Sequence, residues 1–178
     1  MNQATLSPSD RLLELFPNLL TPATYSGEQS YLRFRLSDSQ LGLLAMDRVR
    51  ESLLLDAEKI TPIPNMPLPC LGLMSSRDEV FPVINLSLAL ELQKTTQSAR
   101  QYQIIVIDTQ PQSNESSLLG LIIPQVQGVN RFKQVEVTDI APESNVNIKA
   151  AVQGVLTLEE EQLWILDASQ LNKLQSLQ

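Results

Sequence analysis

The sequence predicts a mostly β protein built from two similar lobes, and two observations support this fold class. Short apolar segments separated by turn residues recur along most of the 178 residues. A hairpin-like stretch in the first half also has an echo in the second half. Many short strands at this spacing are typical of a β-barrel or a β-sandwich. The composition, with 43% hydrophobic and 19% charged residues, is that of an ordinary globular protein.

Residues 1–29 are expected to form an N-terminal extension with a short helix and a linker. Ser7-Pro8-Ser9-Asp10 combines capping hydroxyls, a proline and an early acid, which together indicate a helix start. The apolar residues that follow would form one stripe, stopped or kinked by Pro17. Residues 21–29 then have the composition of a linker.

From Tyr31 onward the hydrophobic pattern has a period of two, which predicts β-strands. In YLRFRL, Leu32, Phe34 and Leu36 can face a core while the residues between them face water. The same criteria predict further strands at residues 41–46, 52–55, 71–76, 80–84, 103–107, 118–123, 126–132, 152–158 and 162–166.

The stretch GLMSSRDEVFPVINL, residues 72–86, is echoed by GVLTLEEEQLWILDA, residues 154–168. The offset is constant, because 154 − 72 and 167 − 85 both equal 82. This pairs Gly72 with Gly154 and Asn85 with Asp167, and it sets Arg77-Asp78-Glu79 against Glu159-Glu160-Glu161. Upstream, Gly42 matches Gly120 at an offset of 78. A chance match of short apolar hairpins is the alternative to a duplication into two lobes, the first at about 30–95 and the second at about 100–176.

The composition also excludes several functional classes. Without histidine, the chain has neither the commonest general base nor the commonest metal ligand, and we expect no metal or cofactor. A net charge of −7 argues against nucleic-acid binding, and Cys70 has no partner for an internal disulfide. An enzyme that uses paired carboxylates stays open, because such acids need not be adjacent in sequence.

The expected location is the cytoplasm. No apolar run approaches the roughly 18 residues of a membrane span, and the N-terminus lacks the features of a signal peptide. A module that binds partner proteins therefore remains, with exposed arginines and the apolar rim of the groove between the lobes as its expected anchors.

An ordered set of short motifs resembles the CheW family of bacterial chemotaxis coupling proteins. Val49-Arg50-Glu51 is followed by Pro64-Asn65 and by a hairpin that carries Gly72, Arg77, Pro82 and Leu86 at the family's spacing. In the second half the resemblance continues through Gly120-Leu-Ile-Ile-Pro-Gln-Val126 and the closing strands at 152–167. It covers residues 30 to 176, so a CheW-like domain is expected over residues 30–178.

The resemblance implies two interlocked five-stranded SH3-like β-barrels with short helices, and no catalysis. It implies an adaptor that couples the cytoplasmic tip of a chemoreceptor to the regulatory domain of a CheA-type histidine kinase, with the kinase on one lobe and the receptor tip between the lobes. The alternatives are a CheW-like scaffold or competitor that binds only one of these partners, and an enzyme of unknown type.

The resemblance also implies partner-binding residues. Arg77 takes the place of the family's characteristic arginine, and Val49 and Glu51 fall in a strand implicated in partner contact. Gly120, Val126 and Val129 match second-lobe positions linked to the receptor groove. A solvated turn is the alternative for Arg77, and core packing is the alternative for the three valines. Glu51 is expected to pair with Arg77 if the two side chains share a face.

Three departures from the family pattern predict a divergent member, one that serves a pilus-based or light-directed taxis system instead of a flagellar one. Asp78 stands where a glycine is usual, Asn85 where an aspartate is usual, and Pro124 where an acid is usual. Aspartate tolerates a positive φ better than most residues, so we expect the turn at Arg77-Asp78 to survive.

Overall fold

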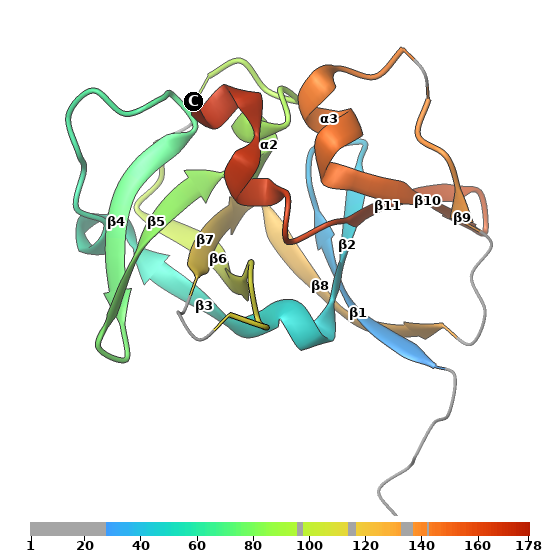
Figure 1. Cartoon of the computed structure of the whole chain (residues 1–178), viewed down its shortest axis with the longest axis horizontal. Coiled ribbons are helices and arrows are strands. Elements are labelled where there is room, and N and C mark those ends of the chain that lie inside the picture. Colours follow the sequence, from blue (N-terminus) through green and yellow to red (C-terminus); the bar gives the residue numbers. More distant parts are fainter. Residues whose placement is uncertain (1–27, 96–97, 114–116, 133–136, 142) are drawn as a thin grey trace, which may run out of the picture.

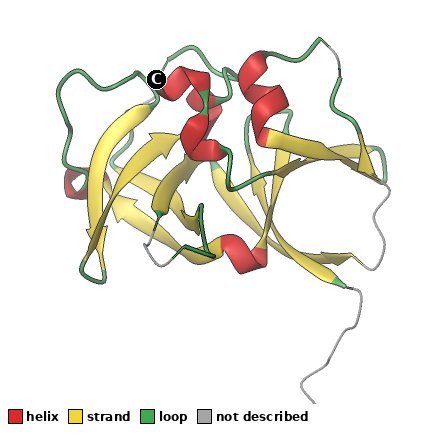
Figure 2. Ribbon diagram, in the orientation of Figure 1, coloured by secondary structure: helices red, strands yellow, loops and turns green. Residues whose placement is uncertain are grey.

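The chain folds into two β-sheets that share one core, with α2, α3 and the C-terminal turns on one side (Figures 1 and 2). The computed structural model describes residues 28–95, 98–113, 117–132, 137–141 and 143–178. The mostly β class predicted from the sequence is confirmed. The helix expected within residues 1–29 lies outside the described residues, apart from the end of its linker.

The first sheet has six strands and draws on both ends of the chain. Its neighbours pair antiparallel except for β11 and β2, which run parallel. In spatial order the strands are β8 (Gln125–Phe132), β1 (Gln29–Arg35), β2 (Leu41–Ala45), β11 (Glu161–Leu166), β10 (Val152–Leu158) and β9 (Val137–Thr138).

The second sheet has five strands, all from the middle of the chain. Its one parallel pair joins β5 to β7. In spatial order the strands are β3 (Val49–Asp56), β6 (Gln101–Asp108), β7 (Leu118–Ile123), β5 (Glu79–Asn85) and β4 (Cys70–Ser76).

The two sheets are interlocked along the chain rather than consecutive. The expected division near residues 95–100 is not a boundary between sheets, because β1 and β2 pair with later strands and β6 and β7 pair with earlier ones. Among the described residues each sheet is open in its strand order, so the closed SH3-like barrel stays a prediction.

Short helices link and cover the sheets. Each echoed hairpin runs into a helical turn, α2 after β5 and η3 after β11, and the further helix α3 precedes β10. The helices are η1 (Met46–Arg48), η2 (Ala57–Lys59), α2 (Leu86–Ala89), α3 (Val146–Ala151), η3 (Leu171–Lys173) and η4 (Gln175–Leu177).

The two sheets share a pattern of strand pairing. The parallel pair β5–β7 in the second sheet has its counterpart in β11–β2 of the first. Gly120 lies opposite Val83 across one parallel pair, and Gly42 lies opposite Trp164 across the other. The two hairpins also share a register, because Gly72 pairs with Val83 and Gly154 with Ile165, whereas the register across the two parallel pairs differs by one residue. The shared topology supports a duplication, which stays a prediction.

The echoed glycines have a steric cause. Thr61 exchanges two backbone hydrogen bonds with Leu73, at 2.8 and 2.9 Å, and so crosses over β4. A Cβ on Gly72 would lie 2.1 Å from the Thr61 carbonyl oxygen. In the other sheet β9 crosses β10 in the same way, and a Cβ on Gly154 would lie 2.0 Å from Val137 Cγ1. At Gly72 the obstacle is the backbone of the paired segment, so this position needs glycine, whereas at Gly154 the nearest atom belongs to the Val137 side chain.

The echoed polar residues Asn85 and Asp167 each end a strand and start a helical turn. Asn85 Oδ1 accepts a hydrogen bond from the Leu88 N–H at 3.1 Å, and Asp167 Oδ1 accepts from the Ser169 N–H at 2.9 Å. Burial would raise the pKa of Asp167, but hydrogen bonds from Ser169 and Gln153 and the charge of Arg48 lower it below its ordinary value. Asn85 thus caps α2, whereas Asp167 closes a local turn two residues long, and in both copies the side-chain oxygen accepts a backbone N–H just after the strand.

The central strands are buried on both faces, which explains their continuous apolar sequence. On β6, Ile105 and Ile107 face the other sheet, while Ile104 and Val106 face a smaller cluster inside the five-stranded sheet. We call the larger cluster the inter-sheet core. Its buried members are Leu32, Phe34, Leu36, Leu44, Ile84, Leu86, Ala89, Leu90, Ile105, Ile107, Leu119, Leu121, Ile123, Ile148, Ala151, Val152, Leu166, Ala168, Leu171 and Leu174.

The C-terminal turns complete this core. Leu171 and Leu174 are fully buried in it. Ser176 joins the helices of the two halves, because its hydroxyl donates to the Ala89 carbonyl at 2.7 Å and its N–H donates to Asn147 Oδ1 at 3.2 Å. Figure 1 shows these turns lying between α2 and α3. The end of the chain therefore ties the two halves together.

The close approach at Gly72 predicts a large difference between two glycine substitutions. Gly72 and Gly128 both have left-handed φ angles, +146° and +136°, but a Cβ on Gly128 meets nothing within 4 Å. We expect Gly72→Ala to lower the free energy of unfolding by about 3 kcal/mol or more, and Gly128→Ala by about 1–2 kcal/mol. Urea unfolding of both variants measures the difference, and equal losses would contradict the steric explanation.

Candidate functional site

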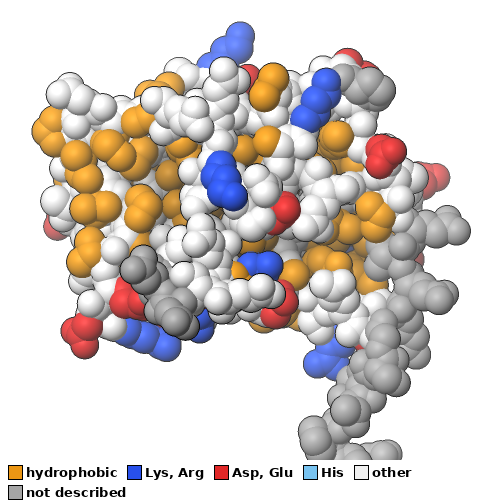
Figure 3. Space-filling view, viewed as in Figure 1, with side chains coloured by type: hydrophobic (Ala, Val, Ile, Leu, Met, Phe, Trp, Pro, Cys, Tyr) orange, Lys and Arg blue, Asp and Glu red, His pale blue; other side chains and the backbone are white. Residues whose placement is uncertain are grey.

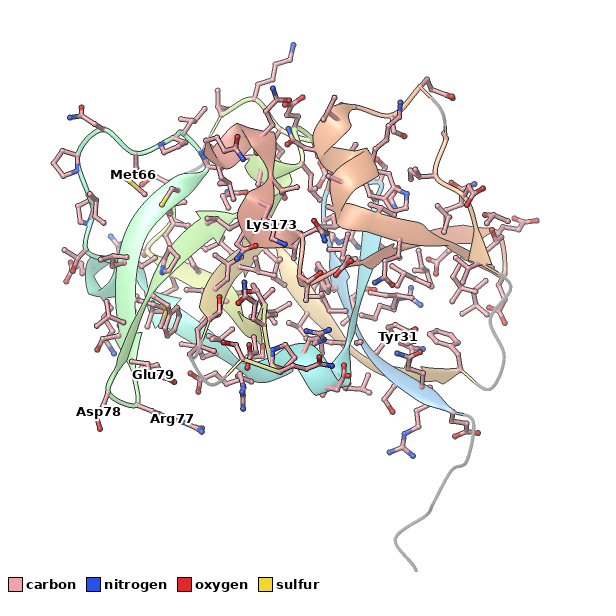
Figure 4. The ribbon with its side chains drawn as sticks, viewed as in Figure 1. Tyr31, Met66, Arg77, Asp78, Glu79 and Lys173 are labelled. Carbon is pink, nitrogen blue, oxygen red and sulfur yellow. The ribbon has the colours of Figure 1, made fainter. Side chains whose placement is uncertain are left out.

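Arg77 lies at the tip of the hairpin formed by β4 and β5. Ser76 pairs with Glu79, so Arg77 and Asp78 form a two-residue turn, with φ angles of 49° and 68°. Both values belong to the turn type that normally selects asparagine and glycine. The Arg77 side chain is 82% exposed, and Figure 4 shows Arg77 and Asp78 at the outer end of the hairpin. The turn expected from the sequence is therefore present despite Asp78.

Glu51 on β3 faces this turn. Arg77 Nη2 lies 3.6 Å from Glu51 Oε2, and the Ser76 hydroxyl donates a hydrogen bond to Glu51 Oε1 at 2.6 Å. The predicted pairing of Glu51 with Arg77 is confirmed. Because β3 and β4 are the two outer strands of the five-stranded sheet, these contacts reach across its open seam. They hold the hairpin tip against β3.

A second ion pair lies beside the first and was not predicted. Arg50 Nη2 lies 2.5 Å from Asp108 Oδ2, and the Asp108 side chain is only 4% exposed. The other carboxylate oxygen of Asp108 accepts a hydrogen bond from the Gln110 N–H at 3.0 Å. The sequence does contain a sign that Asp108 is buried, because this acid directly ends the apolar run of β6. It gave no indication that Arg50 would be the partner 58 residues away.

The two ion pairs border one hollow in the surface. It has a volume of about 420 Å³. A second hollow of about 300 Å³ adjoins it through Glu79 and Leu118 and reaches Asn172. The first is lined by Arg50, Glu51, Ser76, Arg77, Glu79, Val106 and Leu118. All of these residues belong to the five-stranded sheet or to its hairpin turn.

The other four predicted site residues lie apart from Arg77. Val49 and Val126 are partly buried and pack against the inter-sheet core. Gly120 is buried within β7, where a Cβ would lie 3.1 Å from Val83 Cγ2. Val129 is 54% exposed on β8, an outer strand of the six-stranded sheet. Only Val129 of these four offers a large apolar side chain to a partner without rearrangement.

The six-stranded sheet has its own charged hairpin with the opposite polarity. Glu159 and Glu160 form its turn, with φ angles of 48° and 77°. Glu161 accepts a hydrogen bond from Arg33 Nη2 at 2.7 Å, and Arg33 Nε donates to Gln127 Oε1 at 2.7 Å. The two hairpins thus share a backbone shape, but one tip presents an arginine and the other presents acids.

The sequence analysis did not predict the exposed apolar loop between η2 and β4. Ile63, Met66 and Leu68 are 36%, 42% and 66% exposed. Figure 3 shows hydrophobic side chains gathered at the end of the molecule where β4 and this loop lie. The sequence feature that could have indicated this exposed apolar loop is the absence of any charged residue over 60–76.

The described residues contain neither a candidate metal-binding cluster nor a helix that could span a membrane. Among the described residues, no group of three or more His, Cys, Asp or Glu side chains is placed to hold a metal ion. Within the same part of the chain, no helix is long and apolar enough to cross a membrane.

Comparison with known proteins gives one family and one fold. A family model described as the CheW-like domain matches residues 30–175. Among solved structures, the chain is similar to the crystal structure of the scaffolding protein TtCheW from Thermoanaerobacter tengcongensis, with a TM-score of 0.67 and 21% sequence identity. That match covers 83% of this chain and 94% of the other. No curated protein matches the chain.

The strained turn predicts that glycine at residue 78 stabilises the protein. Asp78→Gly relieves a left-handed φ at an exposed position, so we expect the free energy of unfolding to rise by about 0.5–1 kcal/mol. Ser75→Gly, at an exposed extended position of the same hairpin, should instead lower it by about 0.5–1 kcal/mol. Denaturant unfolding compares the two, and a loss in Asp78→Gly as large as that in Ser75→Gly would be inconsistent with turn strain.

Proposed function

The chain belongs to the CheW-like domain family, and on this premise we propose that it is a non-enzymatic adaptor that couples chemoreceptors to a CheA-type histidine kinase. The observation that carries the proposal is the family match over residues 30–175, nearly the whole described chain. The adaptor acts in the cytoplasm, in flagellar, pilus-based or light-directed taxis. It uses no cofactor.

A coupling protein has to keep two partner surfaces in a fixed relative position. Coupling between sites is a free energy transmitted by the structure that joins them. Here the inter-sheet core takes side chains from both sheets, and the chain crosses between the sheets. This arrangement supports the proposal, because a partner on one sheet and a partner between the sheets would contact one rigid body.

We assign the kinase regulatory domain to the hollow of the five-stranded sheet. Arg77 and Glu51 border this hollow, and Val49 shares the strand of Glu51. The receptor tip is assigned to the region between the sheets. There Val129 and Val126 offer apolar contacts on β8, and Gly120 permits the close packing of β7 on Val83. The contact of Glu51 with Ser76 across the open seam supports an SH3-like barrel for this lobe.

The experiment is a binding measurement with both partners. The full chain is titrated by calorimetry with the regulatory domain of a CheA-type kinase and with a soluble receptor-tip fragment, first singly and then with the other partner saturating. An adaptor binds both at once and changes kinase activity in a receptor-dependent way. Binding of a single partner would replace coupling with the scaffold or competitor alternative, and binding of neither would refute both.

Charge reversal at Arg77 tests the assignment of the hollow. Arg77→Glu should weaken binding of the kinase regulatory domain at least about tenfold, because it replaces an exposed guanidinium with a repelling acid beside Glu51. The melting temperature should change by less than about 2 °C, because an exposed ion pair contributes little to stability.

Glu159→Arg is the matched control, since it reverses charge at the equivalent tip of the other hairpin. It should leave kinase binding within about twofold of the original value. If the two variants weaken binding equally, or if Arg77→Glu unfolds the protein, the assignment is wrong.

A further inference from the structure

Arg50 lines the same hollow as its neighbour Glu51, although adjacent residues of a strand normally point to opposite faces. The pairing of β3 with β6 explains this. Val49 pairs with Ile107 and Glu51 with Val106, so Arg50 is the extra residue of a β-bulge. Bulges redirect a side chain and are over-represented next to functional sites. The backbone of β3 thus brings Arg50 to the side of the sheet where Arg77 lies.

Asp108 fixes the direction of the Arg50 side chain. Its buried carboxylate is held by the Gln110 N–H on one oxygen and by Arg50 Nη2 on the other. The Arg50 side chain is nevertheless 59% exposed. A guanidinium group carries five N–H donors in a rigid fork, and the bond to Asp108 uses Nη2. Arg50 is therefore anchored at one point, with most of its donors turned toward solvent.

The hollow offers more free donors than free acceptors. Glu51 Oε1 is already bonded to the Ser76 hydroxyl, and Glu51 is only 25% exposed. Arg77 Nη2 lies 3.6 Å from Glu51 Oε2, which is longer than a hydrogen bond. The guanidinium group of Arg77 can therefore still donate hydrogen bonds to a ligand. Glu79, on the same hairpin as Arg77, adds a negative charge to the hollow, which favours a partner that brings a single carboxylate rather than an acidic cluster.

We propose that Arg50 and Arg77 together hold one side-chain carboxylate of the protein partner, and that Asp108 is a positioning residue for Arg50. The inference rests on the proposed function and deepens it by naming the chemistry that the hollow recognises. Arginine forks match carboxylate geometry through paired N–H···O bonds. Leu118 also lines the hollow and is partly exposed, so it offers an apolar contact to the neighbouring part of the partner.

Because the hollow is built entirely from the five-stranded sheet and its turn, the occupant is a partner that binds this lobe alone. The probe is therefore the regulatory domain of a CheA-type kinase, titrated into the full chain. Arg50→Ala should weaken binding about tenfold and reduce its salt dependence. Arg50→Lys should also weaken binding several-fold, because it keeps the charge but loses the fork.

Asp108→Asn tests the positioning role. It removes the charge that anchors Arg50 but leaves Arg50 in place, so we expect a smaller loss of binding than in Arg50→Ala. The double variant with Asp108→Asn and Arg50→Ala should bind the probe as weakly as Arg50→Ala alone. Arg100→Ala, an exposed arginine at the start of β6, is the matched control and should stay within about twofold of the original affinity. Thermal unfolding checks that each variant is folded. If Arg50→Ala loses stability, Arg50→Lys still tests the site, because it keeps a cation beside the buried Asp108.

The outcomes separate this inference from the proposed function. If Arg50→Lys and Arg50→Ala both bind the probe like the original chain while Arg77→Glu does not, the two-arginine site is wrong and the adaptor proposal stands. If the unaltered chain binds neither the kinase domain nor a receptor tip, both fall together.

A double-mutant cycle identifies the carboxylate itself. Exposed Asp and Glu residues of the kinase domain are changed one at a time to Asn or Gln and titrated with the original chain and with Arg50→Lys. One of them should show a coupling with Arg50 of about fivefold or more. Additivity within about twofold for every pair would overturn the proposal.

Discussion

The structure depends on one apolar cluster that both sheets share. β1 and β2 contribute Phe34 and Leu44 to the inter-sheet core from one side, and β6 and β7 contribute Ile105 and Leu121 from the other. Each of these strands lies at or near the centre of its sheet. One face of the strand packs in the inter-sheet core, and the opposite face packs in a smaller core within its own sheet. Neither sheet can therefore be removed without exposing a large buried surface of the other. That constraint makes two sheets into one body.

The duplicated unit also shows which features the fold requires and which are free to differ. Gly72 and Gly154 recur where a neighbouring segment leaves no room for a Cβ, and Asn85 and Asp167 recur where a side-chain oxygen accepts a backbone N–H after the strand. The hairpin tips are under no such constraint. They share a left-handed turn but carry Arg77 in one copy and Glu159 in the other. The charge at Arg77 is therefore available for recognition, which agrees with its place on the rim of the hollow.

The sequence predicted local features better than distant ones. Period-two patterns located the strands because each strand has an inner and an outer face, and the turn at Arg77-Asp78 followed from its position between two apolar runs. The interlocked order of the strands could not be read from such patterns, because β1 and β8 meet across almost a hundred residues. The pairing of Arg50 with Asp108 escaped prediction for the same reason, and the bulge that aims Arg50 leaves no local signature. Glu51 was found because the family resemblance placed it on a strand implicated in partner contact.

If the shared core makes the two sheets a single cooperative unit, native-state hydrogen exchange should detect one opening transition for both. Amide protons of β2 in the six-stranded sheet and of β6 in the five-stranded sheet should exchange with the same free energy, equal to that of global unfolding. A destabilising change confined to one sheet, such as Gly154→Ala, should lower both values equally. Exchange from β2 at a clearly lower free energy than from β6 would show that one sheet opens alone, and would contradict the account.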